Sequence, residues 1–394
     1  MSDSHDQPPA RSILTRLSHL GRPSGDDRIF VNQPVVRAST ILYDSVADLH
    51  SKKARYTYGR RGTPTSEALE TAISEIEGAA GTVLTPSGLA AVSLALMSAV
   101  SAGDHVLVVD CIYQPGRHFC DTTLKRFGVT TTYFDPHIGA GIAELFQENT
   151  RAVYLESPGS ETFEIADIRA IAEVAHARDV LVIVDNTWAT PVFHRPLELG
   201  ADISLMAATK YIVGHSDALI GTVAANERAW PQVKTTHGNL GLFTGPDDMY
   251  LTLRGLRTLG IRLRHHEQSS LKIARWLETR PEVDRVLYPA LESHPDHALW
   301  KRDFTGATGL MGVILKPVAP AGVAAFIDGL AYFGIGYSWG GYESLAVPTY
   351  PATHRSATQW TAEGPTIRLQ IGLEEADDLI ADLSAGFARL AAHA

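Results

Sequence analysis

Two patterns of hydrophobic and polar positions divide the chain. In the first, apolar residues recur every three or four positions, which predicts helices from Thr65 to about Ile76, over 87–100, up to Phe127 and over 247–278. Gly255 and Gly260 weaken the last of these helices, because glycine lowers helix propensity.

The second pattern consists of short runs that are apolar throughout. They predict strands at 82–86, 105–110, 152–158, 180–186, 202–209 and 220–226. Strands of this kind, separated by helices, are typical of a parallel sheet that is covered on both faces. We therefore predict an α/β fold.

The two ends of the chain depart from this alternation. Residues 1–62 are rich in turn formers and predict an N-terminal arm, followed by a large α/β domain over 63–262. In 263–394 the stretches GLMGVILKP and TIRLQIGLE predict a smaller domain with an antiparallel sheet. The polar start, MSDSHDQPPARS, predicts a mobile tail and has no apolar segment of a secretory signal.

Composition narrows the class of protein. Hydrophobic residues make up 45% of the chain and charged residues 20%, as in soluble globular proteins. The net charge of −10 argues against nucleic acid as a partner, and no apolar run is long enough to span a membrane. Cys111 and Cys120 form no CxxC pair, so we expect reduced, structural thiols in a cytoplasmic protein.

A lysine and an aspartate follow two of the predicted strands. Asp185 ends VLVIVD, and Lys210 follows ISLMAAT in a stretch without another cation. The carboxyl ends of parallel strands meet at one edge of a sheet, where ligands bind. The pair has two interpretations: a buried ion pair, or a site for pyridoxal phosphate (PLP), with the lysine as a Schiff base and the carboxylate on the pyridinium N–H.

A phosphate site is also predicted. TPSGLAA (85–91) combines a strand end, a turn and a helix N-terminus, where Ser87, Gly88 and Leu89 can donate backbone N–H groups to an anion. Tyr113, three residues beyond the strand that ends at Asp110, is placed to stack on a cofactor ring.

Two other motifs give weaker evidence of a function. HHEQSS (265–270) has Ser270 where a zinc motif needs histidine, so we expect no metal site. GYSWG (336–340) matches the nucleophile elbow of hydrolases, but His354 precedes every aspartate downstream of Ser338.

The sequence resembles the Cys/Met-metabolism family of PLP-dependent enzymes from about Arg37 to Ala391. The matching motifs are YGRRGTPT (58–65), ESPGS (156–160), VDNTWA (184–189), ATKYIVGHSDALIGT (208–222) and RGLRTLGIRLRHH (254–266). The resemblance implies the aspartate-aminotransferase-like fold of PLP fold type I: a mostly parallel seven-stranded sheet in the large domain, and a smaller C-terminal α/β domain.

The resemblance also implies residue roles around the cofactor. Lys210 would bind PLP covalently as a Schiff base, and its freed amine would take the Cα proton and protonate the leaving sulfur. Asp185 would pair with the pyridine nitrogen. Tyr113 would stack on the ring, and its phenol is a second candidate for deprotonating the incoming amine.

Tyr58 and Arg60 would bind the phosphate from the neighbouring subunit, so the resemblance implies a dimer with shared sites and, as the family norm, a tetramer. Thr209 would add a hydroxyl to the phosphate. Ala207 departs from the serine common in the family, which removes one phosphate donor.

Arg368 lies in an otherwise apolar strand, and burying an unpaired arginine costs several kcal/mol. A substrate α-carboxylate is its expected partner, with a structural ion pair as the alternative. By resemblance, Ser338 and Trp339 would line the carboxylate site and Tyr250 would face the substrate. We expect Trp188 to pack beside Asp185.

Within the family, YSWGGYESL (337–345) and ESPGS most resemble the bacterial β-lyase branch. That branch implies α,β-elimination of L-cystathionine to homocysteine, pyruvate and ammonia in methionine biosynthesis by transsulfuration. Cystine and other cysteine S-conjugates would react too. Three alternatives stay open: a γ-lyase or γ-synthase, a broader cysteine-conjugate lyase, and a PLP-binding regulatory protein with weak lyase activity.

Overall fold

Two β-sheets organise the protein. The computed structural model describes residues 12–23, 28–51 and 53–392. The larger sheet has seven strands in the order β1-β7-β6-β5-β4-β2-β3, and only β7 runs antiparallel to its neighbours. Its strands are β1 (Gly81–Thr85), β2 (His105–Val109), β3 (Thr130–Phe134), β4 (Thr150–Glu156), β5 (Leu181–Asp185), β6 (Ile203–Met206) and β7 (Gly221–Ala225). The predicted α/β class and the mostly parallel sheet are confirmed.

Helices cover this sheet, and their apolar faces explain why it is buried. Strands β1, β2, β5, β6 and β7 are buried at every position, as their continuous apolar runs predict. The helices of this part are α3 (Pro64–Glu77), α4 (Gly88–Ala99), α5 (Gln114–Phe119), α6 (Ile168–His176), α7 (Thr190–Phe193) and α8 (Trp230–Leu240). A π-helical turn at Cys120–Leu124 continues α5.

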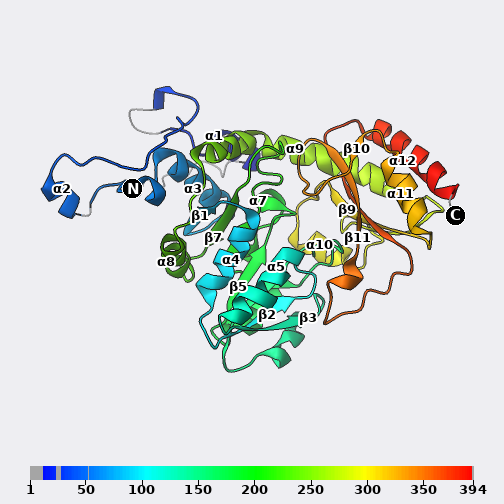
Figure 1. Cartoon of the computed structure of the whole chain (residues 1–394), viewed down its shortest axis with the longest axis horizontal. Coiled ribbons are helices and arrows are strands. Elements are labelled where there is room, and N and C mark those ends of the chain that lie inside the picture. The colour runs from blue at the N-terminus through cyan, green and yellow to red at the C-terminus, as the bar shows by residue number, and fades with distance from the viewer. Residues whose placement is uncertain (1–11, 24–27, 52, 393–394) are drawn as a thin grey trace, which may run out of the picture.

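The smaller sheet lies toward the C-terminus (Figure 1). It has five strands in the order β10-β11-β12-β9-β8, antiparallel except between β10 and β11. The strands are β8 (Val283–Leu287), β9 (Leu310–Leu315), β10 (Phe333–Gly334), β11 (Ser344–Thr349) and β12 (Thr366–Gln370). The helices are α10 (His297–Asp303), α11 (Pro320–Asp328) and α12 (Ala376–Ala391). No helix in the part of the chain that the structure describes is long and apolar enough to cross a membrane.

A single long helix, α9 (Pro246–Glu278), joins the two parts. The predicted domain boundary at 262/263 falls inside it, so the division into domains stays a prediction. Gly255 is required where α9 passes the turn after Lys210, because a Cβ there would lie 2.3 Å from the carbonyl oxygen of Ile212.

A second connection between the two parts is the segment 351–360, named here the strap. Its backbone N–H groups at Ser356, Ala357 and Thr358 donate to the buried carboxylate of Asp110, at 2.9, 3.0 and 2.8 Å. Arg117 forms an ion pair with the same carboxylate. Burial alone would raise the pKa of Asp110, but these hydrogen bonds and Arg117 outweigh it, and the pKa is lowered.

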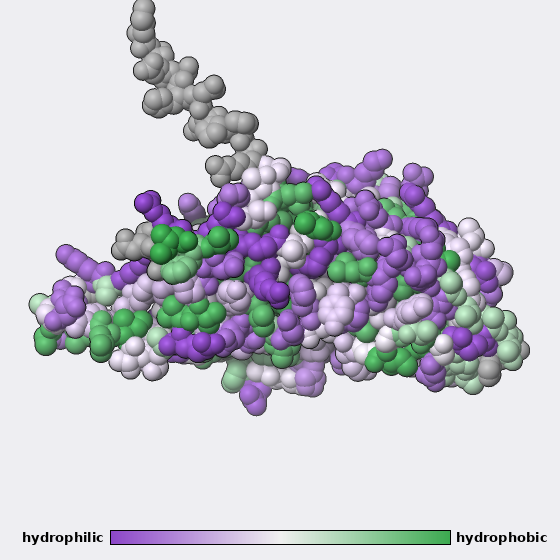
Figure 2. Space-filling model, turned by 90° about the horizontal axis from the view of Figure 1, so that it is seen from above, coloured by the Kyte–Doolittle hydropathy of each residue, from purple (hydrophilic) through white to green (hydrophobic). Residues whose placement is uncertain are grey.

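The N-terminal arm is more regular than predicted. It contains α1 (Ile13–His19), α2 (Val46–Ser51) and a 3-10 turn at Gly59–Arg61. Leu17 and Leu20 of the α1 segment are buried, and Arg257 of α9 donates to the carbonyl of Leu17 at 3.1 Å. The rest of the arm exposes large apolar side chains: Ile29, Phe30, Val31, Leu42, Val46 and Leu49. Hydrophobic groups are accordingly visible on the surface at the arm end of the molecule, at the left of Figure 2.

Candidate active site

The candidate residues meet at the carboxyl edge of the large sheet. Asp185 ends β5, Lys210 follows β6 by four residues, and Tyr113 follows β2 by four residues. Arg368 comes from β12 of the smaller sheet. Each of these four side chains changes the pKa of at least one of the others, so they share one site.

Lys210 is a largely buried amine that has no acidic ion-pair partner among the described residues. Its Nζ donates to Ser338 Oγ at 2.6 Å and lies 5.1 Å from the centre of the Trp339 ring. Burial and, to a smaller extent, the nearby Arg368 lower its pKa to about 8, although Asp185 opposes this. A lysine with this pKa is partly neutral near physiological pH and can act as a nucleophile or base. The alternative of a Lys210–Asp185 ion pair is not what the structure forms.

Two close contacts fix the turn that carries Lys210. Buried Arg262 of α9 donates to the carbonyls of Tyr211 and Ile212 at 2.6 and 3.1 Å. Gly340, with φ +83°, packs on the same turn, and a Cβ there would lie 2.8 Å from the backbone nitrogen of Tyr211. The sequence analysis missed the role of Arg262, because several other cations stand beside it in the same helix and its burial is a tertiary feature.

Asp185 is held as a buried hydrogen-bond acceptor. Its Oδ1 accepts from the backbone N–H of Thr187 at 2.9 Å and from the Thr187 hydroxyl, and its Oδ2 accepts from the Tyr154 hydroxyl at 3.4 Å. Burial raises its pKa, while these hydrogen bonds and Lys210 oppose the rise. A carboxylate in this position needs a cationic or N–H partner.

Glu156 is a second carboxylate that sequence reasoning missed. It pairs with Asp185 across β4 and β5, and its Oε2 accepts from the backbone N–H of Tyr113 at 2.6 Å. Burial and then the charge of Asp185 raise its pKa well above the usual value. A glutamate ending an apolar strand next to an aspartate in the same position was the available signal.

Arg368 contacts the segment that carries Ser338, and its role as a carboxylate-binding residue stays a prediction. Its Nη2 donates to the carbonyl of Ser338 at 3.1 Å, and no acidic side chain of the described residues forms an ion pair with it. Ser338, with φ +78°, therefore links Arg368 and Lys210 through its carbonyl and its hydroxyl. Trp339 packs against Tyr211, with ring centres 5.4 Å apart, beside the same lysine.

Tyr113 has an exposed side chain (44%), and its stacking on a cofactor ring stays a prediction. Burial of its phenol, followed by Glu156 and Asp185, raises its pKa, and Arg368 opposes this. Acidic and basic side chains of the site thus act on the same phenol.

The segment predicted to bind phosphate lies at the start of α4. Ser87 caps this helix by accepting from the N–H of Ala90 at 3.2 Å, and Gly88 and Leu89 follow in its first turn. A Cβ on Gly88 would lie 2.4 Å from the Cβ of Ala207, so the glycine permits this close approach. The Thr209 hydroxyl already exchanges hydrogen bonds with the backbone of Ile220, at 3.1 and 2.9 Å.

Three predicted residues are not brought to this group within one chain. Tyr58 is exposed, and Arg60 donates to the carbonyl of Gly238 at 3.1 Å. Tyr250 lies in the first turns of α9, and within the described ranges no hydrogen bond, ion pair or ring contact joins it to Lys210 or Arg368. The roles of all three stay predictions.

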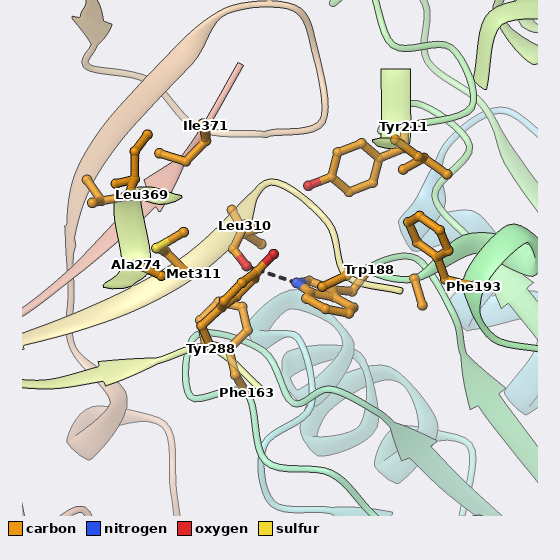
Figure 3. Packing of buried hydrophobic residues seen from close by; sticks show 14 of the residues in the cluster. Phe163, Trp188, Phe193, Tyr211, Ala274, Tyr288, Leu310, Met311, Leu369 and Ile371 are labelled. Carbon is orange, nitrogen blue, oxygen red and sulfur yellow. Dashed lines mark hydrogen bonds between the residues drawn. The ribbon is translucent and has the colours of Figure 1, made fainter. Parts of the chain in front are cut away.

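Trp188 packs in the core behind Asp185. Its Nε1 donates to the carbonyl of Leu310 in β9 at 3.0 Å, and its ring makes an edge contact with Tyr288 (Figure 3). A second edge contact joins it to Phe304. It therefore joins the strand end that carries Asp185 to the smaller sheet. Cys111 and Cys120 are buried and free, as predicted.

Comparison with known proteins shows to which family the chain belongs. Residues 15–388 match the family model of the Cys/Met metabolism PLP-dependent enzymes. A protein of Rhizobium johnstonii, provisionally named a cystathionine beta-lyase, is 53% identical over 96% of this chain and 97% of its own length. The cystathionine beta-lyase of Escherichia coli is 46% identical over 96% of this chain and 99% of its own.

Similarity to a solved structure supports the same family. Cystathionine gamma synthase from Xanthomonas oryzae pv. oryzae superposes with a TM-score of 0.89 at 34% identity, covering 98% of this chain and all of the other. The resemblance inferred from the motifs and the prediction of PLP as cofactor are confirmed. The chain belongs to the Cys/Met-metabolism family of PLP-dependent enzymes.

Proposed function

We propose that the protein is a carbon–sulfur lyase that cleaves L-cystathionine by α,β-elimination to homocysteine, pyruvate and ammonia. The observation that carries this proposal is the bridge through Ser338, which holds Lys210 and Arg368 side by side, each without an acidic partner among the described residues. A base and a carboxylate receptor so placed suit an amino-acid substrate whose Cα proton is to be removed. The names of the most similar relatives support the same reaction.

The residues present fit PLP. The first turn of α4 offers backbone N–H groups to a phosphate, and the lack of a Cβ on Gly88 lets this turn approach Ala207, which precedes Lys210 by three residues. Asp185 offers a carboxylate to the ring nitrogen, Lys210 a partly neutral amine for the Schiff base, and Tyr113 an exposed ring for stacking. When bound, PLP supplies an electron sink for the pair left at Cα.

The chain's own residues then position the substrate and move the proton. Arg368 grips the α-carboxylate with its planar guanidinium. Lys210 Nζ removes the Cα proton and afterwards delivers a proton to the leaving sulfur. Ser338 fixes the position of the Lys210 amine relative to the Arg368 guanidinium, because it accepts a hydrogen bond from each of them.

We also propose that the working unit is a homodimer with shared sites, assembled into a tetramer, in the cytoplasm. Tyr58 and Arg60 do not contact Lys210 in their own subunit, although the motif that carries them is expected at the phosphate. The exposed apolar side chains of the arm offer a surface for a second copy of the chain. The two buried free thiols fit a reducing compartment.

The test is product identification. Purified protein with PLP and L-cystathionine is expected to release pyruvate and homocysteine, detected by mass spectrometry. Release of 2-oxobutyrate and cysteine would contradict β-elimination and favour a γ-lyase, a candidate supported by the close fit to the γ-synthase structure. No turnover of cystathionine or of cystine would favour the regulatory alternative.

Arg368→Lys is expected to raise KM for L-cystathionine about 100-fold with a smaller change in kcat. Lysine keeps the charge but cannot form the paired hydrogen bonds of a guanidinium, and disrupting a buried charge pair costs about 2–5 kcal/mol. Steady-state kinetics check this, with the absorbance of bound PLP as a control that must be unchanged. An unchanged KM would mean that the α-carboxylate binds elsewhere.

The pKa of Lys210 predicts how the apoenzyme takes up its cofactor. The rate of Schiff-base formation with PLP requires neutral lysine, so it should rise with pH and level off just above the pKa of about 8. Below that pH the rate should fall about tenfold per pH unit, as the amine is protonated. Stopped-flow absorbance measures the rate; a plateau near the ordinary lysine value would show that burial does not lower the pKa.

A further inference from the structure

Glu161 is a charged residue at the site that the reaction above does not use. It stands in the loop 159–164, which is closed by hydrogen bonds from Gly159 N to the Glu164 carbonyl and from Phe163 N to the Gly159 carbonyl, both 2.9 Å long. Ser160 N donates to the Cys111 carbonyl at 2.9 Å. The loop is therefore fixed to the segment that leads to Tyr113.

The backbone at Glu161 adopts a conformation that glutamate rarely takes. Its φ is +64°, and Phe163 has φ +63°. Such conformations persist only where the surroundings enforce them, and they gather at binding sites. Arg355 of the strap enforces this one, because its guanidinium contacts both the Thr162 hydroxyl and the Glu164 carboxylate.

The side chain of Glu161 is half-buried, and within the described residues no hydrogen bond or ion pair reaches its carboxylate. Burial raises its pKa, while His354 and Arg368 oppose the rise, and Glu161 in turn acts on Arg368 and Glu156. The carboxylate thus lies close to the predicted receptor of the α-carboxylate without being paired to it.

A small hollow adjoins this carboxylate. Glu161 lines it together with Gln114, Ser160 and His354, and its volume of about 20 Å³ accommodates one group of the size of a water molecule. Arg355 and Asp110 also line the hollow, but each is already in an ion pair, with Glu164 and Arg117 respectively. An ammonium group has that size. An unpaired, partly buried carboxylate beside such a hollow is suited to a cation that can donate hydrogen bonds.

L-Cystathionine brings such a cation. Once Arg368 holds the α-carboxylate at the reacting end, the homocysteine half still carries an ammonium and a carboxylate. We propose that Glu161 binds the ammonium of the leaving half and so makes the enzyme selective for thioethers with a positive charge beyond the sulfur. This inference rests on the proposed function and adds a specificity-determining residue to it.

An alternative role for Glu161 predicts the opposite effect on substrate binding. If Glu161 served only to balance the charge of Arg368, it would compete with the α-carboxylate of every substrate. Removing its charge would then improve the binding of all substrates alike. The proposal instead requires a loss confined to substrates that carry the distal ammonium.

The experiment compares Glu161→Gln with wild type on two substrates: L-cystathionine and its desamino analogue, which lacks only the distal ammonium. The charge-assisted hydrogen bond to the ammonium is expected to be lost, raising KM for cystathionine about tenfold, with kcat little changed. KM for the desamino analogue should stay within about twofold, because no ion pair is removed. The KM of Glu161→Asp for cystathionine should lie between those of wild type and Glu161→Gln. Its KM for the desamino analogue should equal that of wild type.

Glu363→Gln is the matched control, since it removes the same charge from an exposed position and should alter neither KM. Binding is also measured without turnover in a Lys210→Ala background, by titrating each ligand into the PLP-loaded protein. In that background Glu161→Gln should weaken the binding of cystathionine about tenfold and leave the affinity for the analogue unchanged.

The outcomes distinguish the role of Glu161 from the proposed lyase reaction. Equal effects of Glu161→Gln on both ligands, or tighter binding of both, overturn the role of Glu161 and leave the lyase assignment intact. If wild type forms no pyruvate while the Lys210→Ala protein still binds cystathionine with the expected preference, the proposed reaction fails and the recognition stands. If neither ligand binds, both fail.

Discussion

Lys210→Ala is expected to lower pyruvate release from L-cystathionine at least about 1,000-fold. General acid–base catalysis by one positioned side chain contributes about 10²–10⁴-fold, and here the same amine both removes the Cα proton and protonates the sulfur. The Lys210 amine donates a hydrogen bond to Ser338 and lies over the face of the Trp339 ring. These contacts are few. Alanine should therefore leave the fold intact.

The measurement is pyruvate formation under saturating substrate, with circular dichroism to confirm folding. Lys316→Ala, which removes an exposed lysine of the smaller domain, is the matched control and should retain full activity. Residual activity above about one-tenth of wild type would assign the proton transfers to another group, with the Tyr113 phenol as the first candidate.

Asp185→Asn is expected to reduce kcat about 100–1,000-fold, the range for loss of one preorganised electrostatic contact. Asparagine keeps the shape, and its one carbonyl oxygen can still accept the two hydrogen bonds from Thr187, whereas its amide NH2 replaces the oxygen that accepts from the Tyr154 hydroxyl. It removes the charge that keeps the cofactor's ring nitrogen protonated. Dialysis should also release PLP faster from this variant than from wild type.

Steady-state kinetics and the absorbance retained after dialysis test this effect. Asp179→Asn controls for the loss of one negative charge, because the Asp179 side chain is 96% exposed and its ion pair is with Arg228, away from the site. Wild-type kcat in Asp185→Asn would show that the charge beside the ring is dispensable. The hydrogen bond from the retained amide would then be sufficient.

The sequence predicted the sheet best where strands are buried on both faces. Strands β4, β5 and β6 appear within a few residues of their predicted positions, because continuous apolar runs have few other stable arrangements. The strand Thr130–Phe134 was missed: it lies at the sheet edge, is only partly buried and carries four polar or amphipathic residues. The antiparallel direction of β7 was likewise not visible in its pattern.

The short helix α1 escaped detection for a different reason. It is stabilised by packing on α9, more than two hundred residues away, and seven residues give too little local periodicity to recognise. For the site, strand-end positions and family motifs led to Lys210, Asp185, Tyr113 and Arg368. Glu156 and Glu161 were missed, since one depends on strand register and the other on a loop closed by tertiary contacts.

The strap has a mechanical consequence. Because Asp110 binds three consecutive N–H groups of the strap, the two sheets are fastened there as well as through α9 and the Trp188–Leu310 hydrogen bond. Two bodies attached at several separate points cannot rotate freely about any one of them. Substrate entry should therefore depend on movement of loops at the rim, and hydrogen exchange at 356–358 should be as slow as in the sheet beneath.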